Sequence, residues 1–241
     1  MPSFNVSVGG ANPTVNAGSG KEFSVSVDRV DGFEGEIRVD IEGVPPGFYV
    51  TTPIIIEEGQ TQALGTINAL PDAPQPTPEN SKATKVTATA MIRGTEVSKD
   101  VNNLGEIKLA EKPKLLLKLL AANDASAEPT PDAPLELTVA PGETITARVK
   151  VERNGFDGSA GIGKADAGRN MPHGVYVDNI GLNGLLIVEG QNERTFFITA
   201  SKTAEETTRT FHLRSDAEGN QTSWPVILHV RRGNSLAQNQ K

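Results

Sequence analysis

The chain has 241 residues, a net charge of −7 and no cysteine, which excludes disulfides, thiolate metal sites and cysteine nucleophiles. The length fits one large domain or two of about 100–130 residues. Residues 1–110 hold 8 basic and 14 acidic side chains, so nucleic-acid binding is not expected, and no window approaches the ~18 apolar residues of a membrane helix.

Stretches in which apolar and polar residues alternate follow one another through the first half, at residues 4–8, 23–27, 37–41 and 86–92. This period of two predicts half-buried strands, and the Gly, Pro, Asn and Asp residues between them predict turns. The segment Pro71–Asn80 is expected to be a loop between two strands, because proline lacks the N–H that a sheet needs.

The alternation continues in the second half, at residues 135–139, 145–151, 211–213 and 226–230. The apolar run Leu115–Ala122 is too short to separate a buried strand from a helix, but its position at the start of this half favours a strand. A second Pro-rich segment, 123–134, is expected to form a loop after it. The whole pattern predicts an all-β fold of antiparallel sandwiches.

Blocks of the first half return in the same order in the second half. RVDGFEG (Arg29–Gly35) returns as RNGFDG (Arg153–Gly158), PPGFYV (45–50) as PHGVYV (172–177), IIIEEGQ (54–60) as LIVEGQ (186–191), and TINA (66–69) as FITA (197–200). The offset between copies grows along the chain, as loop insertions in a shared scaffold produce. We therefore predict two domains, residues 1–112 and 113–241, the second being a copy of the first with a loop insertion at 178–184.

The repeated R-x-x-G-F-x-G blocks predict scaffold rather than chemistry. Asp31-Gly32 and Asn154-Gly155 are hairpin turn signals in which both residues take positive φ. The phenylalanine that follows each turn, Phe33 or Phe156, is expected to close one end of its sandwich. The arginine that precedes each turn, Arg29 or Arg153, is expected to bond the carbonyls of the turn.

The segment GSAGIGKADAGRN (158–170) resembles a phosphate-binding loop at Gly158, Gly163 and Lys164, but Ala165 stands where a Ser or Thr should bind magnesium. By the repeat, residues 159–165 align with the expected strand around residues 37–41. No helix can open after Lys164 because two glycines and a proline follow. We interpret the match as a coincidence.

With R-x-x-G-F-x-G, P-x-G-x-Y-V and E-G-Q in both copies, the chain resembles the tandem immunoglobulin-like modules near the C-termini of large exported bacterial proteins, where pre-peptidase C-terminal-like domains are neighbours. The resemblance implies two tandem immunoglobulin-like antiparallel β-sandwiches with an extracytoplasmic, non-catalytic role. Since no secretory signal opens this sequence, it also implies a fragment of a longer precursor. No ligand or active residue comes with it.

The three histidines suggest no catalytic or metal site. His212 and His229 lie out of phase with the apolar faces of their strands and are expected to point to solvent, and two imidazoles alone make a poor zinc site. His173 stands where the first copy has Pro46, so its turn does not require it.

The acidic and serine residues are no better candidates. Glu57 and Glu58 are adjacent on extended chain and point opposite ways, and no G-x-S-x-G nucleophile elbow occurs. A calcium site at Asp28, Asp31 and Glu34 is less expected than a solvated turn. We predict that the chain is not an enzyme and holds no metal and no cofactor.

Aromatic residues are too few to predict a sugar-stacking platform. They make up 5% of the chain, with one Trp and two Tyr. Tyr49 and Tyr176 are matched scaffold positions, and Trp224 is in phase with Val226 and Leu228, so we expect it in the core or capping an edge.

The copies differ most around the insertion, which makes this region the weak candidate for ligand binding. Amide, carboxylate and guanidinium groups on a Gly-rich backbone suit a polar ligand or a partner's main chain; equally, such residues are ordinary turn formers. The candidates are Asp166, Arg169, Asn170, Asp178, Asn179 and Asn183.

The sequence therefore predicts a structural spacer, or a protein-interaction or adhesion unit, of a larger exported protein. Its expected partners are other domains of its own precursor or a separate protein. The alternative is a carbohydrate-binding module that uses the polar loops of the second domain, with polysaccharide as partner.

Overall fold

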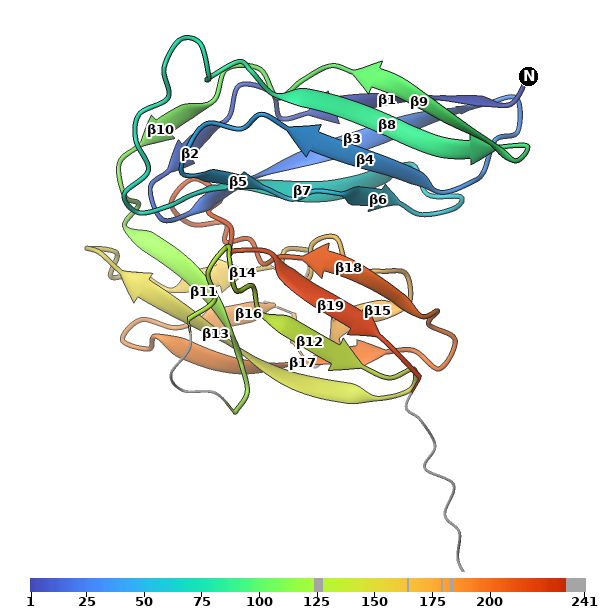
Figure 1. Cartoon of the computed structure of the whole chain (residues 1–241). Helices are drawn as coiled ribbons and strands as arrows, with labels where there is room; N and C mark the ends of the chain where they lie inside the picture. Colours follow the sequence, from blue (N-terminus) through green and yellow to red (C-terminus); the bar gives the residue numbers. More distant parts are fainter. Residues whose placement is uncertain (124–127, 164, 179, 183, 233–241) are drawn as a thin grey trace, which may run out of the picture.

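The computed structural model describes residues 1–123, 128–163, 165–178, 180–182 and 184–232. These residues form two β-sandwiches that lie side by side, the first above the second in Figure 1. No helix occurs among them, so the described part of the chain contains none that could cross a membrane.

The first sandwich has one sheet in the order β1-β3-β7-β5 and a second in the order β6-β4-β8-β9, with a short parallel pair β10-β2 beside them. The strands are β1 (Ser3–Gly9), β2 (Thr14–Asn16), β3 (Gly20–Val30), β4 (Ile37–Glu42), β5 (Phe48–Val50), β6 (Ile54–Ile56), β7 (Gln62–Ala69), β8 (Lys85–Ile92), β9 (Thr95–Val101) and β10 (Lys108–Ala110). The Pro-rich segment 71–80 connects β7 to β8, as expected.

The second sandwich repeats the first sheet in the order β11-β13-β17-β15. Its strands are β11 (Leu115–Ala121), β12 (Glu136–Val139), β13 (Thr144–Arg153), β14 (Ala160–Ile162), β15 (Val175–Asp178), β16 (Leu185–Ile187), β17 (Glu193–Ala200), β18 (Thr207–Phe211) and β19 (Val226–Val230). The apolar run from Leu115 is thus a strand and not a helix, which confirms the prediction based on its place at the start of the second half.

The opposite layers of the two sandwiches differ. In the first, β4 pairs with both β6 and β8, so the layer is continuous. In the second it is divided into β14-β16 and β12-β19-β18. The short pairs β10-β2 and β12-β19 are parallel, while the long central strands of both sandwiches pair antiparallel, as expected. The fold is nevertheless that of two tandem immunoglobulin-like β-sandwiches.

Each sandwich has its own core. One cluster of buried apolar residues runs from Phe4 to Ile107, and the other from Leu115 to Val230. The predicted boundary at residue 112 falls between these clusters, which supports the division into two domains.

The R-x-x-G-F segments are not hairpins. The strands that flank each of them, β3 and β4 or β13 and β14, lie in different sheets, so each segment carries the chain across the sandwich. Asp31 and Gly32 have φ of 50° and 74°, and Gly155 has φ of 90°, but Asn154 does not share the positive φ. The hairpin prediction was therefore wrong, and the two turns also differ.

The predicted role of the paired arginines is confirmed. Arg29 donates to the carbonyls of Gly35, Glu57 and Gln60, and Arg153 donates to those of its own crossing and of the 188–191 turn. Each guanidinium also lies over the phenylalanine that follows it, at 5.6 and 5.7 Å from the ring centroid. One side chain therefore ties two loops and an aromatic plug together at the same end of each sandwich.

The Gly-rich segment does not form a phosphate-binding loop. Its strand, β14, pairs with β16 in the way that β4 pairs with β6. Lys164 lies outside the described residues, and residues 165–168 form turns rather than a helix. No helix N-terminus is available there to face an anion.

Candidate functional site at the junction of the sandwiches

The outer face of the first sheet, formed by β3, β7 and β5, is covered by the second sandwich. Two segments of the second sandwich lie against it, residues 165–173 and residues 212–224. In Figure 1 the corresponding loops lie beneath β5 and β7. We call this contact the junction.

Glu22 is the centre of the junction. It lies on β3 next to the inward-facing Phe23, and its partners are all in the second sandwich, so its carboxylate points out of the first sandwich. Arg169 donates to both carboxylate oxygens, Nη2 to Oε1 at 2.6 Å and Nε to Oε2 at 2.7 Å. His212 Nε2 lies 2.8 Å from Oε2, and Arg214 Nη1 donates to Oε1 at 2.9 Å. One buried carboxylate thus holds three side chains of the other sandwich.

The backbone of the second sandwich presents these side chains together. Arg169 and His212 exchange both backbone hydrogen bonds, at 3.0 and 3.1 Å, which ties the 165–173 segment to the end of β18. Arg214 also pairs with Asp166, whose Oδ1 lies 2.6 Å from Nη2. The cluster is therefore rigid on the side that faces Glu22.

The electrostatics of the cluster favour a permanently ionised Glu22. Burial raises the pKa of its carboxyl, but the hydrogen bonds and charges of Arg169 and His212 outweigh burial and lower the pKa to about 2. Burial lowers the pKa of His212, against the opposing effect of Glu22, while the bond to Glu22 raises the pKa of Arg169. A carboxylate with such a low pKa stays ionised at neutral pH and does not exchange protons there. It is therefore suited to binding the second sandwich rather than to acid–base chemistry.

Asn170 makes a second contact. Its Oδ1 accepts the backbone N–H of Leu64 at 2.9 Å and Nη2 of Arg209 at 3.0 Å, and its Nδ2 donates to Thr210 O. Arg209 is buried, and its Nη1 lies 2.7 Å from Glu57 Oε1. Glu57, which sequence analysis set aside as half of an unsuitable pair, therefore belongs to the junction.

A third contact is a close backbone approach at Gly20. Thr222 N donates to Gly20 O at 3.2 Å, and Ser19 Oγ donates to Gln221 Oε1 at 2.6 Å beside it. A Cβ at position 20 would collide with Asn68 Nδ2 and Thr222 Oγ1. Glycine is needed here because the second sandwich sits directly on the strand.

The linker between the sandwiches is also held on both sides. Asn16 Nδ2 donates to Glu111 O at 2.8 Å on the first sandwich, and Lys114 O accepts Asn154 N at 2.7 Å on the second. Lys112 Nζ lies 2.6 Å from Glu152 Oε1.

Trp224 lies at the junction. It is half-buried and packs edge-on against Tyr49 of the first sandwich, with ring centroids 5.9 Å apart. Its side chain was expected in the core or capping an edge, and the core placement was wrong, because the covering of one sandwich by the other was not visible in the alternation.

The predicted ligand-binding residues separate into three groups. Asp166, Arg169 and Asn170 come together at the junction, where their side chains are bonded within the chain. Asp178 is exposed on β15 and its Oδ2 accepts Thr199 Oγ1. Asn179 and Asn183 lie outside the described residues, and ligand binding by any of the six stays a prediction.

The prediction for His212 was wrong. Its side chain is 1% exposed, because the strand face that points away from its own core is covered by the first sandwich. His229 is half-buried, with Nε2 2.8 Å from Glu136 Oε2. Within the described residues, no three His, Asp or Glu side chains gather as a metal site requires.

Sequence reasoning missed Glu22 and Arg214. Glu22 is an ordinary polar residue of an alternating strand, and its partners are up to 192 residues away in the chain. Only the Gly20 position carries a local hint, since glycine is unusual within a strand and marks close approach of another backbone.

Comparison with known proteins gives only distant structural likenesses. No protein-family model and no curated protein matches the sequence. Among solved structures, the Ig1-2 module of the Drosophila receptor protein tyrosine phosphatase DLAR is 12% identical, with 94% of this chain and 99% of that chain covered and a TM-score of 0.36. A Porphyromonas gingivalis protein of unknown function is 9% identical (95% and 99% covered, TM-score 0.31), and the fibronectin(III)-like modules of Clostridium thermocellum CbhA are 13% identical (98% and 99% covered, TM-score 0.26). Likenesses this distant carry no argument about this chain.

Proposed function

We propose that the chain is a non-catalytic, extracytoplasmic module of a larger exported protein, which holds its flanking domains or a protein partner in a fixed relative orientation. The observation that carries this proposal is the clasp of Glu22 by Arg169, His212 and Arg214. The pre-peptidase C-terminal-like neighbourhood suggested by the repeated motifs fits the same role.

The polar and charged residues of the junction favour a fixed relative orientation of the two sandwiches over contact without a defined angle. Domains in one chain move relative to each other unless their interface is extensive or specific. A buried charge cluster contributes little net stability compared with apolar packing, but leaving one member unpaired costs about 3–5 kcal/mol. Any other docking angle would leave charges unpaired, so one arrangement is strongly preferred.

The test is the distance distribution between one label on each sandwich. The chain has no cysteine, so Met91→Cys and Val188→Cys, both at exposed positions, allow specific spin labelling. We expect one narrow distance in the otherwise unaltered chain and a broad distribution after Glu22→Ala. Thr146→Ala, at the repeat-equivalent position of Glu22, is the control and should leave the distance narrow. A broad distribution in the unaltered chain would contradict the proposal.

Carbohydrate binding is the second candidate, favoured by one observation. Tyr176 and Phe197 are 49% and 37% exposed, and they lie diagonally on the neighbouring strands β15 and β17, close enough for one flat ligand to touch both rings. Asp178 is directly opposite Phe197. Affinity electrophoresis in soluble polysaccharides, with Phe197→Ala as the variant and Met91→Ala as the control, tests it: retardation that Phe197→Ala abolishes would favour this function, and no retardation would end it.

A further inference from the structure

A continuous groove runs along one side of the junction. It consists of three hollows of about 220, 170 and 230 Å³. The first and second share Thr130, Pro131 and Trp224 as lining residues, and the second and third share Thr52, Thr210 and Ile227. The hollows therefore form one elongated site, with the first sandwich as one wall and the second as the other.

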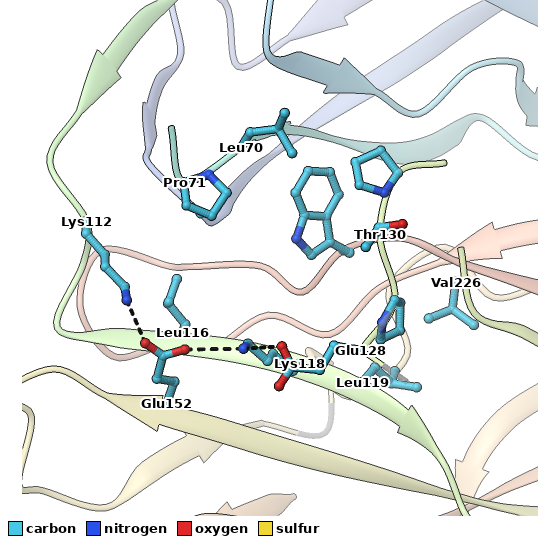
Figure 2. A pocket seen from close by; sticks show the side chains of 14 residues that line it. Leu70, Pro71, Lys112, Leu116, Lys118, Leu119, Glu128, Thr130, Glu152 and Val226 are labelled. Carbon is cyan, nitrogen blue, oxygen red and sulfur yellow. Dashed lines mark hydrogen bonds and ion pairs between the residues drawn. The ribbon is translucent and has the colours of Figure 1, made fainter. Parts of the chain in front are cut away.

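The lining of the groove is mainly apolar. In the first hollow, Leu70 and Pro71 of the first sandwich face Leu116 of β11, and Thr130 lies at the side (Figure 2). Pro53, Pro134 and Pro225 continue this lining through the other two hollows.

The charged groups along the groove are already paired. Lys112 and Lys118 bond Glu152, and Lys118 also bonds Glu128 (Figure 2). At the other end the charge of Arg209 is matched by Glu57, 2.7 Å from its Nη1, although the buried Nε and Nη1 of Arg209 make no hydrogen bond. An occupant should therefore be largely uncharged where it touches these ends.

One wall of the groove includes the free edge of a strand. Among the strands that the structure describes, β18 pairs with β19 alone. His212 directs its backbone N–H and C=O away from β19, toward Arg169, and alternate residues of an antiparallel strand point the same way. Thr210 and Thr208 therefore face outward too. Asn170 bonds Thr210 O, which leaves Thr210 N–H and both backbone groups of Thr208 without a strand partner in the described part of the chain.

The opposite wall has a second free edge. Thr51 N donates to Thr66 O, and Gly47 O accepts Leu70 N, so these alternate residues face β7. Val50, which lines the second hollow, consequently turns its N–H and C=O away from the sheet. Unpaired main-chain donors and acceptors on both walls match a polypeptide backbone better than they match a sugar.

From this geometry we infer that the groove binds an extended, largely uncharged polypeptide segment from a partner protein. The segment adds as a strand to the outer edge of β18 at Thr208 and Thr210, and its alternate apolar side chains enter the third hollow, which these two residues line together with Ile227. Because both walls must stay in register, this inference rests on the fixed junction proposed above.

Binding can be followed directly, since Trp224 is the only tryptophan of the chain and lines the groove. Random 12-residue peptides displayed on phage are selected against the full chain, and synthetic copies are titrated while the emission of Trp224 is recorded. We expect dissociation constants on the order of 10 µM for the best peptides. N-methylation of a bound peptide should weaken binding about tenfold or more at the alternate positions whose amides face β18, and less at the positions between them, where Val50 alone, among the described residues of the groove, offers a main-chain partner.

Two variants of Thr208 distinguish the loss of its backbone N–H from the loss of its side chain. Thr208→Pro removes the outward N–H at an edge position where proline is tolerated and should weaken peptide binding at least tenfold, whereas Thr208→Val keeps the N–H and should bind normally. If Thr208→Pro does not fold, the N-methylation series on the unaltered chain decides.

Failure to select any peptide, binding that is insensitive to N-methylation, or a Trp224 response to cello- or chito-oligosaccharides but not to peptides would each overturn the inference. The spin-label distance is measured in parallel. A narrow distance without peptide binding removes the groove proposal alone, and a broad distance removes the fixed junction as well.

Discussion

The two sandwiches present the same sheet face to opposite surroundings. In the first sandwich, one row across the sheet consists of Glu22 on β3, Thr66 on β7 and Thr51 at the end of β5. The row at the same register in the second sandwich consists of Thr146 on β13, Phe197 on β17 and Asp178 on β15. The first row is covered by the second sandwich, and Thr66 is fully buried. The second row has no cover within the described residues, and Phe197 is 37% exposed.

The covered face is the more polar of the two. Glu22, Thr66 and Asn68 are buried or nearly so, while the aromatic rings of Tyr176 and Phe197 are exposed. Contact between the sandwiches therefore depends on matched hydrogen bonds and charges rather than on apolar area. Such contacts define one geometry, whereas apolar faces tolerate sliding.

The largest difference between the faces should come from removing the central carboxylate. Glu22→Ala removes the carboxylate partner of buried His212 and of partly buried Arg169, and leaves Arg214 with Asp166 alone, so the free energy of unfolding should fall by about 3–5 kcal/mol. Thr146→Ala, the matched change on the exposed face, should stay within ~0.5 kcal/mol. Urea titrations followed by Trp224 emission measure both, and equal effects would contradict the comparison.

Lowering the pH should reduce the free energy of unfolding in two stages, one for each titrating group of the covered face. His212 has a pKa below its ordinary value of 6.5 in the folded chain, so the unfolded chain takes up its proton first and stability falls as the pH drops below 6.5. Glu22, with a pKa of about 2 against an ordinary 4.5, adds stability above 4.5 that is lost as the pH falls toward 2. The lower stage is worth on the order of 3 kcal/mol.

Unfolding free energies from pH 8 to pH 3 test these two stages. His212→Gln should remove the upper stage, and Glu22→Gln should remove the lower one. A pH profile that neither substitution alters would show that other groups are responsible.

A smaller effect is expected at the close backbone approach. Gly20→Ala places a Cβ against Asn68 and Thr222, and relief of that clash should cost about 1–3 kcal/mol. The equivalent residue in the second sandwich, Thr144, is exposed and already carries a side chain, so Thr144→Ala should be neutral. Thermal unfolding of the two variants compares them, and a neutral Gly20→Ala would place the second sandwich farther from β3.

The smallest difference should occur where the copies are alike. Arg29→Ala and Arg153→Ala each remove bonds to loop carbonyls and the contact with a phenylalanine, for about 1–3 kcal/mol apiece. Because these arginines serve each sandwich internally, neither change should broaden the spin-label distance. Broadening by one of them would mean that its loops reach the junction.

The sequence predicted the strands and turns inside each sandwich but not the contacts between the two sandwiches. Alternation locates the strands, and repeated blocks locate the arginine-bonded turns, since both depend on residues near each other in one copy. His212 was expected in solvent because alternation shows only which side faces away from the local core. Its burial depends on Glu22, 190 residues earlier, and no local pattern encodes such a pair.

The linker of four residues between β10 and β11 has a mechanical consequence. If the two sandwiches were pulled apart, the contacts of Glu22 would break before a strand of either sandwich unfolded. The tether keeps the separated surfaces at a high effective concentration, so the clasp would close again when the pull eased. The contact between the sandwiches would thus open under strain and re-form afterwards without unfolding of either sandwich.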